Sequence, residues 1–347
     1  MWHGCRSMAV LTDTDELEAA WGALAGQRTE KGFLTVALGH SKPRFRVGIM
    51  FPEGDETLLV GFNVDVPPAK SGLPEGSGFR VELAREAPAP GFAIWVCLIR
   101  QPGAGRDLFV QMSADIVAAL SATQTQSDSW LLSLMLARIR AWQEFMRRPR
   151  SGLLSPEEEI GLFGELVFLR EALDAGAPAA GMLHSWAGPA GGLQDFQTET
   201  VGIEIKSTIS ASGFPAQISS LEQLDGLAGR AVILGGVRLC QQEGGQTLSE
   251  LVGGLRMRVA QSRDLAGWLD RSLLLAGYEE NAASRYLRRY DVVDTRFFEV
   301  DGSFPCLRRS STVPVIRSAN YQIDLDLVEA ATLSLSETLV RYGVLPA

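Results

Sequence analysis

Short runs of alternating apolar and polar residues fill the first third of the chain. A two-residue period predicts β-strands, and clusters of Gly, Pro and acidic residues between the runs predict turns. The expected strands cover residues 33–39, 44–51, 57–66, 79–86 and 92–101. A short helix over residues 12–25 is expected before them. The pattern therefore predicts a β-rich N-terminal domain over residues 1–125.

A helical period replaces this alternation after the polar run at residues 121–129. Residues 130–148 repeat apolar side chains at helical spacing, which predicts a connecting helix within residues 126–150. Its arginines make this the most basic stretch of the chain: Arg138, Arg140, Arg147, Arg148 and Arg150. Two interpretations are open for them, a solvated face with a favourable helix end or contact with phosphate.

A second helix is predicted to begin after Ser155. Ser155 and Glu158 have the spacing of a capping box, and Pro156 occupies the first helical position. The expected buried stripe of this helix consists of Leu162, Phe163, Leu166, Val167, Leu169 and Leu173. Glu165 lies at the margin of that stripe, where we expect a partly buried carboxylate.

A strand hairpin is predicted next, ending in the stretch VGIEIKST at residues 201–208. A turn centred between Glu199 and Thr200 pairs Phe196 with Ile203, and it sets Asp195 opposite Glu204. An interior strand over residues 231–239 and a helix from residue 248 onward follow. We expect residues 151–260 to form the central domain and residues 261–347 a mixed α/β extension.

Two opposed carboxylates weaken a strand pair unless a cation offsets their repulsion. Oxygen ligands on strands suit Mg²⁺ or Mn²⁺ rather than zinc. Lys206 lies about 6 to 7 Å from Glu204 along the same strand face, and Glu165 can bind a second metal or position water. Metal, lysine and acids together suit phosphodiester hydrolysis. The alternative is that Glu204 and Lys206 form an ordinary surface ion pair.

Composition narrows the choice of function. The 347 residues are 46% hydrophobic and 21% charged with a net charge of −9, which argues against a generally basic nucleic-acid-binding surface. Lysine occurs only at Lys31, Lys42, Lys70 and Lys206. No HExxH, P-loop or CxxC motif is present, and no apolar run approaches the length of a membrane span. We expect a cytoplasmic protein with no membrane contact.

The helix with Glu165, then Asp195, then Glu204-Ile205-Lys206 resembles the core of the PD-(D/E)XK nuclease superfamily. The segments GLFGELVFL, W-x-GP, QDF and IEIKST resemble more narrowly a prokaryotic family of uncharacterised restriction-endonuclease-like proteins. The resemblance implies an α/β (α+β) fold, with a restriction-endonuclease-like core whose mixed central sheet is flanked by helices. One departure is that Pro189 is not adjacent to Asp195, so the literal PD dipeptide is absent.

The resemblance also implies an activity, a Mg²⁺-dependent endonuclease that cuts DNA in restriction or phage defence. Asp195 and Glu204 are the expected metal ligands, the backbone carbonyl of Ile205 is a further ligand, and Mn²⁺ is a substitute metal. Lys206 is expected to orient or activate water with the help of Glu165. Protein partners in a defence system and a homodimer are further expectations. The alternative is a catalytically silent subunit that binds nucleic acid or scaffolds a complex.

Overall fold

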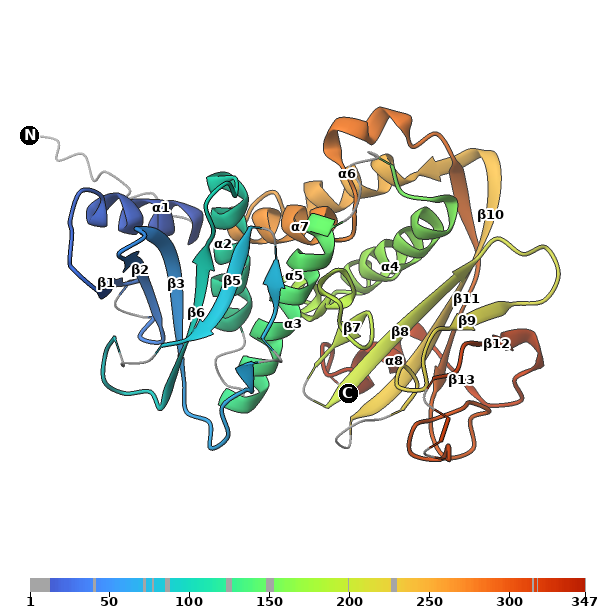
Figure 1. Ribbon diagram of the computed structural model, residues 1–347. Coiled ribbons are helices and arrows are strands. Elements are labelled where there is room, and N and C mark those ends of the chain that lie inside the picture. The colour runs from blue at the N-terminus through green and yellow to red at the C-terminus, as the bar shows by residue number, and fades with distance from the viewer. Residues whose placement is uncertain are drawn as a thin grey trace, which may run out of the picture. The chain divides into compact units, whose positions relative to one another are not determined.

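The computed structural model describes residues 13–39, 42–70, 73–76, 78–84, 88–122, 127–147, 153–198, 200–225, 230–313, 315–316 and 318–346. Residue 12, Arg148, Arg150 and Glu199, which entered the predictions above, lie outside these ranges. The chain folds as two compact units, residues 1–148 and 149–347 (Figure 1). The finer division into four parts stays a prediction.

The first unit contains an antiparallel sheet of six strands in the order β1-β2-β3-β6-β5-β4. The strands are β1 (Gly32–Ala37), β2 (Phe45–Phe51), β3 (Asp55–Phe62), β4 (Glu75–Gly76), β5 (Phe79–Leu83) and β6 (Ile94–Arg100). Helix α1 (Asp13–Leu24) precedes them. The five expected strands and the first helix are therefore confirmed, and β4 is an addition of two residues.

Two helices complete this unit, α2 (Arg106–Ala122) and α3 (Asp128–Arg147). Helix α3 confirms the helix predicted there, whereas α2 was not predicted. Helix α2 is buried on most sides, so its apolar residues do not form a one-sided stripe. Arg138 of α3 is only 2% exposed and donates two hydrogen bonds to Asp115 of α2, at 2.7 and 2.5 Å. Arg138 was expected either to lie on a solvated helix face or to contact phosphate, and its burial shows that both interpretations are wrong for this residue.

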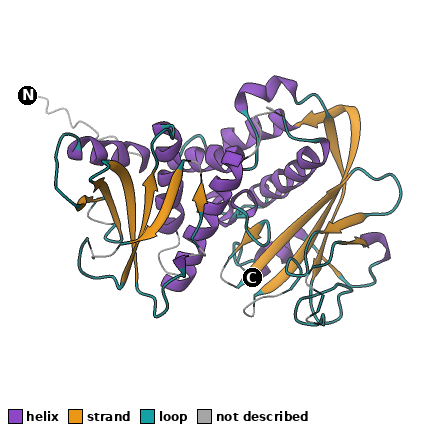
Figure 2. Ribbon diagram, viewed as in Figure 1, coloured by secondary structure: helices purple, strands orange, loops and turns teal. Residues whose placement is uncertain are grey.

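The second unit is built on a mixed sheet in the order β13-β11-β10-β8-β7 (Figure 2). Its strands are β7 (Phe196–Gln197), β8 (Val201–Thr208), β10 (Ala231–Thr247), β11 (Arg289–Glu299) and β13 (Thr332–Leu333). Strand β8 runs parallel to β10, and the other pairs are antiparallel. The expected mixed α/β architecture is confirmed.

The described residues of this unit include helices α4 (Pro156–Asp174), α5 (Ala179–Ser185), α6 (Leu248–Val259), α7 (Arg263–Leu275) and α8 (Leu335–Arg341). Short 3₁₀ turns lie at Gly188–Ala190, Glu280–Arg285 and Leu325–Leu327. None of the helices in the described part of the chain is both long and apolar enough to cross a membrane.

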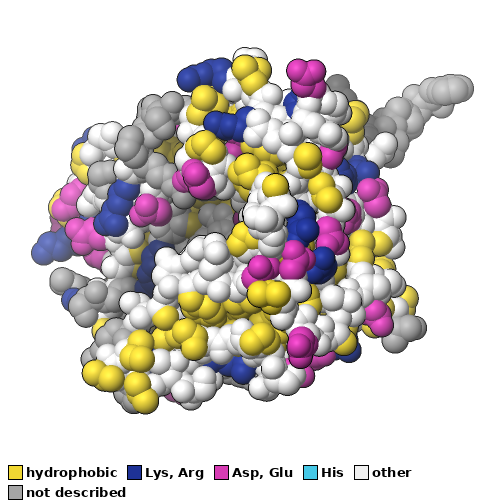
Figure 3. Space-filling model, turned by 90° about the vertical axis from the view of Figure 1, so that its right-hand side faces the viewer, with side chains coloured by type: hydrophobic (Ala, Val, Ile, Leu, Met, Phe, Trp, Pro, Cys, Tyr) yellow, Lys and Arg dark blue, Asp and Glu magenta, His cyan; other side chains and the backbone are white. Residues whose placement is uncertain are grey.

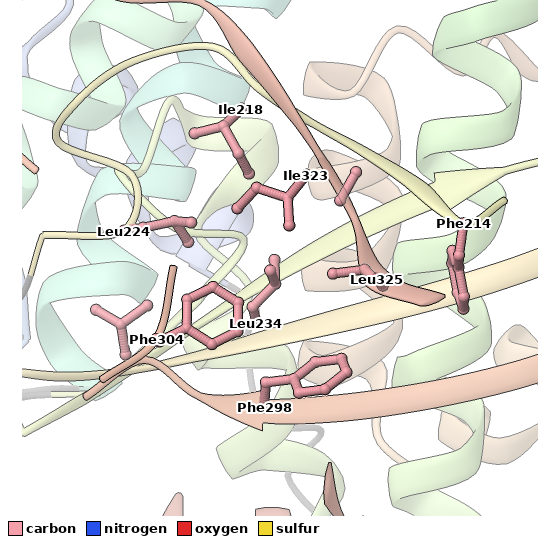
Figure 4. Close-up of a cluster of buried hydrophobic side chains, with 10 residues drawn as sticks. Phe214, Ile218, Leu224, Leu234, Phe298, Phe304, Ile323 and Leu325 are labelled. Carbon is pink, nitrogen blue, oxygen red and sulfur yellow. The ribbon is translucent and has the colours of Figure 1, made fainter. Parts of the chain in front are cut away.

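One face of this mixed sheet is covered by a small two-stranded layer, in which β9 (Pro215–Ile218) pairs with β12 (Tyr321–Asp324). Leu234 and Phe298 of the sheet pack with Ile323 and Leu325 in one buried cluster (Figure 4). Figure 3 views this side of the molecule, where apolar side chains lie among Lys, Arg and acidic side chains. The C-terminal residues therefore form part of the core that packs on β10 and β11.

Helix α4 lies directly against β8 on the other face of the mixed sheet. Its capping box is present as predicted, with Ser155 and Glu158 bonding each other's backbone N–H. The expected stripe is buried except for Leu173, which is half-buried near the helix end. A Cβ added to Gly164 would lie 1.7 Å from Ser207 Oγ and 2.9 Å from Ser207 Cβ. Only glycine therefore permits this close approach of helix and strand.

We expect Gly164→Ala to destabilise the protein, because the new methyl group forces α4 away from β8. Overpacking of this kind costs about 1–3 kcal/mol, more than the roughly 1 kcal/mol that alanine gains over glycine in a helix. Urea unfolding monitored by circular dichroism measures the difference. Gly161→Ala is the matched control, because nothing lies within 4 Å of its added Cβ. An equally stable Gly164→Ala protein would contradict this account of the packing.

Candidate active site

The β7–β8 hairpin sets the register of the candidate residues. Phe196 pairs with Ile203 and Gln197 with Gly202, which confirms the predicted register. Continued by one residue, the same register places Asp195 across from Glu204. Phe196 and Ile203 are both fully buried, so a slip by one residue would move an aromatic ring out of the core.

Backbone groups hold Asp195 in place on both sides. Its Oδ2 accepts a hydrogen bond of 2.6 Å from the amide of Ile205. Its own carbonyl accepts bonds from the amides of Ala187 and Gly188, at 2.7 and 2.9 Å. The segment before β7 therefore folds back on Asp195 and fixes it beside β8.

Glu165 reaches the same place from α4. The indole nitrogen of Trp186 donates a 2.7 Å hydrogen bond to Glu165 Oε2. Trp186 is fully buried and stacks on Phe196, with ring centroids 6.4 Å apart. A Cβ added to Gly188 would lie 3.0 Å from both Glu165 Oε2 and Asp195 Oδ1. The two carboxylates thus meet around a glycine that leaves space between them.

Glu204 and Lys206 form an ion pair, with Nζ 2.5 Å from Oε1. Glu204 is only 2% exposed, so the pair is not the surface salt bridge of the alternative interpretation. Gln223 donates a second hydrogen bond to the same oxygen, at 2.9 Å. The other oxygen, Oε2, is buried and has no hydrogen-bond partner among the described residues. The structure brings together all four residues singled out from the sequence.

Burial among like charges perturbs the acids. Burial and the neighbouring Asp195 raise the pKa of Glu204 to about 8 against the opposing effect of Lys206. Burial and Asp195 also raise the pKa of Glu165 well above its ordinary value, and burial raises that of Asp195. Burial alone would lower the pKa of Lys206, but Glu204 and Asp195 raise it overall. A site with this excess of carboxylates favours a further cation.

The donors suit a hard divalent cation. Mg²⁺ is commonly held by one or two carboxylates together with waters and substrate phosphate, so it does not need a dense cage of side chains. No three His, Cys, Asp or Glu side chains in the described ranges already converge as a metal cluster. The unpartnered Glu204 Oε2 and the space beside Gly188 nevertheless fit such an ion. Asp195, Glu204 and Glu165 offer oxygen donors alone.

Sequence reasoning missed two contributors to this site. Trp186 appears above only within the W-x-GP segment, with no role assigned; it is buried, and its indole donates to Glu165. Gly188 likewise appears there only as a member of that segment. The W-x-GP signal contains both residues, yet their proximity to Glu165 depends on how the chain folds back from α5 to β7.

A mixed sheet whose hairpin carries Asp195 and Glu204-Ile205-Lys206, with Glu165 on the adjacent helix, defines a restriction-endonuclease-like fold. Residues 17–326 match the model of a family described as "Putative PD-(D/E)XK family member, (DUF4420)". The match covers most of the chain, and the protein belongs to this family. No match was found among curated proteins or among solved structures. The resemblance inferred from the motifs is confirmed, and it extends into both units.

We expect Gly188→Ala to weaken divalent-metal binding without unfolding the protein. The new methyl group would press on Asp195 Oδ1 and Glu165 Oε2, displacing the carboxylates and filling the space between them. Titration of Mn²⁺ by calorimetry measures the affinity. Gly181→Ala is the control, since its Cβ makes only an ordinary 3.9 Å contact with Val344. Equal affinity in both variants would show that Gly188 does not border the metal position.

Proposed function

We propose that this protein is a metal-dependent endonuclease that hydrolyses DNA phosphodiester bonds, with Mg²⁺ as its metal and Mn²⁺ as a substitute. One observation carries the proposal. Glu165, Asp195 and Glu204 come from α4, the segment before β7 and β8, and they interact electrostatically with one another and with the half-buried Lys206. Such a concentration of perturbed charges is costly for the fold and is typical of functional sites.

Asp195 and Glu204 would hold the metal, with the carbonyl of Ile205 as a further ligand and Glu165 as another candidate. A metal bound there lowers the pKa of a water molecule and polarises the phosphate. Lys206 keeps its proton because the carboxylates raise its pKa. Its ammonium then orients water or neutralises charge on the phosphate oxygens. Glu165, held by Trp186, would position water or bind a second metal.

Membership in the family supports this proposal over a catalytically silent subunit, because the acids and the lysine of the motif are all present. A role in restriction or phage defence, a cytoplasmic location, a homodimer and protein partners belong to the same proposal. The family match includes residues 17–148 of the first unit, so we propose that this unit serves the same activity through recognition or assembly.

We expect Asp195→Ala and Lys206→Ala each to lower the rate of plasmid cleavage by about 10²-fold or more, the usual effect of removing a group that acts in the transition state. Cleavage of supercoiled plasmid with Mg²⁺ or Mn²⁺, resolved on agarose, measures the rate. Lys42→Ala is the control, since Lys42 is an ion-paired lysine bonded to Asp13 and Glu16. Cutting by Asp195→Ala at the wild-type rate would refute the assignment.

Metal removal gives a test that does not depend on cutting. A ligand that binds only the folded protein stabilises it by about 2.7 kcal/mol at 100 times its Kd. We therefore expect EDTA to abolish cleavage, and Mn²⁺ at that excess to stabilise the wild type by this amount in chemical unfolding. Asp195→Ala should show a much smaller stabilisation. If Mn²⁺ stabilises both proteins equally, it binds elsewhere.

A further inference from the structure

Gln223 stands in the loop at residues 219–225, which follows β9. Its side-chain amide donates the 2.9 Å hydrogen bond to Glu204 Oε1. A second glutamine, Gln217, lies six residues earlier in the chain. The structure separates them, because Gln217 lies on β9 and bonds to the carbonyl of Tyr321 on β12.

The orientation of the Gln223 amide is determined by a neighbouring donor. The backbone N–H of Ser219 donates to Gln223 Oε1 at 2.7 Å. Only the carbonyl oxygen of the amide can accept that bond, so the NH₂ group must face Glu204. Gln223 can therefore donate to the carboxylate whatever else approaches the site.

The loop that carries Gln223 is anchored from two directions. The side chain of Gln194, the residue before Asp195, donates to the carbonyl of Gln223 at 3.0 Å. Asp225 accepts from the amide and hydroxyl of Ser310, at 2.7 and 2.9 Å. Leu221 and Leu224 of the same loop are fully buried. Gln223 is thus held on a fixed backbone, and little conformational freedom is lost when it bonds Glu204.

These contacts make the two oxygens of Glu204 unequal. Oε1 accepts from both Gln223 and Lys206, whereas Oε2 is buried without a partner among the described residues. A carboxylate with one oxygen held in this way presents the other in a fixed direction. Lys206 is on a flexible stem and is needed elsewhere in the proposed reaction, but Gln223 is not.

We propose that Gln223 is a positioning residue, which holds Glu204 by Oε1 so that Oε2 faces the divalent metal. This inference rests on the proposed function, because it assigns a role toward the metal of that site. Gln223 stays on Glu204 when Lys206 turns toward water or phosphate. The C-terminal residues contribute to this positioning through Ser310, which donates to Asp225 in the loop that carries Gln223.

Gln223→Met tests the proposal, because methionine keeps the length of the side chain and removes the amide donor. Gln217→Met is the matched control in the same unit. Mn²⁺ is titrated into each protein by calorimetry, and unfolding in EDTA is measured in parallel to report the stability of the metal-free fold. Gln223→Ala serves as a second variant in case the methionine disturbs the loop.

We expect Gln223→Met and Gln223→Ala to bind Mn²⁺ about 10- to 100-fold more weakly, the usual cost of losing a group that orients a metal ligand. Gln217→Met should bind as the wild type does. An unchanged Mn²⁺ affinity in folded Gln223 variants would overturn the inference and leave the proposed function intact, even if their unfolding midpoints fall. A wild type that binds no Mn²⁺ would overturn both.

Discussion

The repulsion among one buried and two half-buried carboxylates is the constraint on which the second unit depends. Glu165, Asp195 and Glu204 are brought together where burial disfavours their charged forms, and the charge of Asp195 further disfavours ionisation of Glu165 and Glu204. One lysine offsets part of this cost. The scaffold must therefore hold groups that would separate if they were free to move.

Nitrogen donors from the surrounding chain hold each acid at one oxygen. Trp186 bonds Glu165, the amide of Ile205 bonds Asp195, and Gln223 bonds Glu204. Two glycines allow the elements to come close enough, Gly164 where α4 meets β8 and Gly188 where two carboxylates meet. Rigid support of this kind keeps the geometry of a reactive site when the electrostatic energy opposes it.

The support extends well beyond the motif. The loop of Gln223 is fastened to Ser310, and the β9–β12 layer packs on β10 and β11 through a common apolar cluster. The C-terminal residues are therefore part of the scaffold, although they follow the motif by about a hundred residues. The family match likewise includes residues 17–148, so most of the first unit is a regular part of such proteins.

The sequence by itself determined the local elements and the motif. Capping residues defined the start of α4, alternation defined the five larger strands of the first unit, and pairing of Phe196 with Ile203 gave the hairpin register. These features depend on neighbours along the chain, so a pattern can show them. Helix α2 was not predicted, because it is buried on most sides and its apolar residues do not form a one-sided stripe. The burial of Arg138 was not predicted either, because its partner Asp115 lies on another helix.

Only the tertiary structure decided how the site is supported. The contacts of Trp186, Gly188 and Gln223 with the acids join segments separated by about 20 residues. No local period records such contacts, because each arises from the packing of α4, the hairpin and the loop after β9. The sequence singled out the four charged groups, and the packing decided which oxygen of each carboxylate accepts a hydrogen bond.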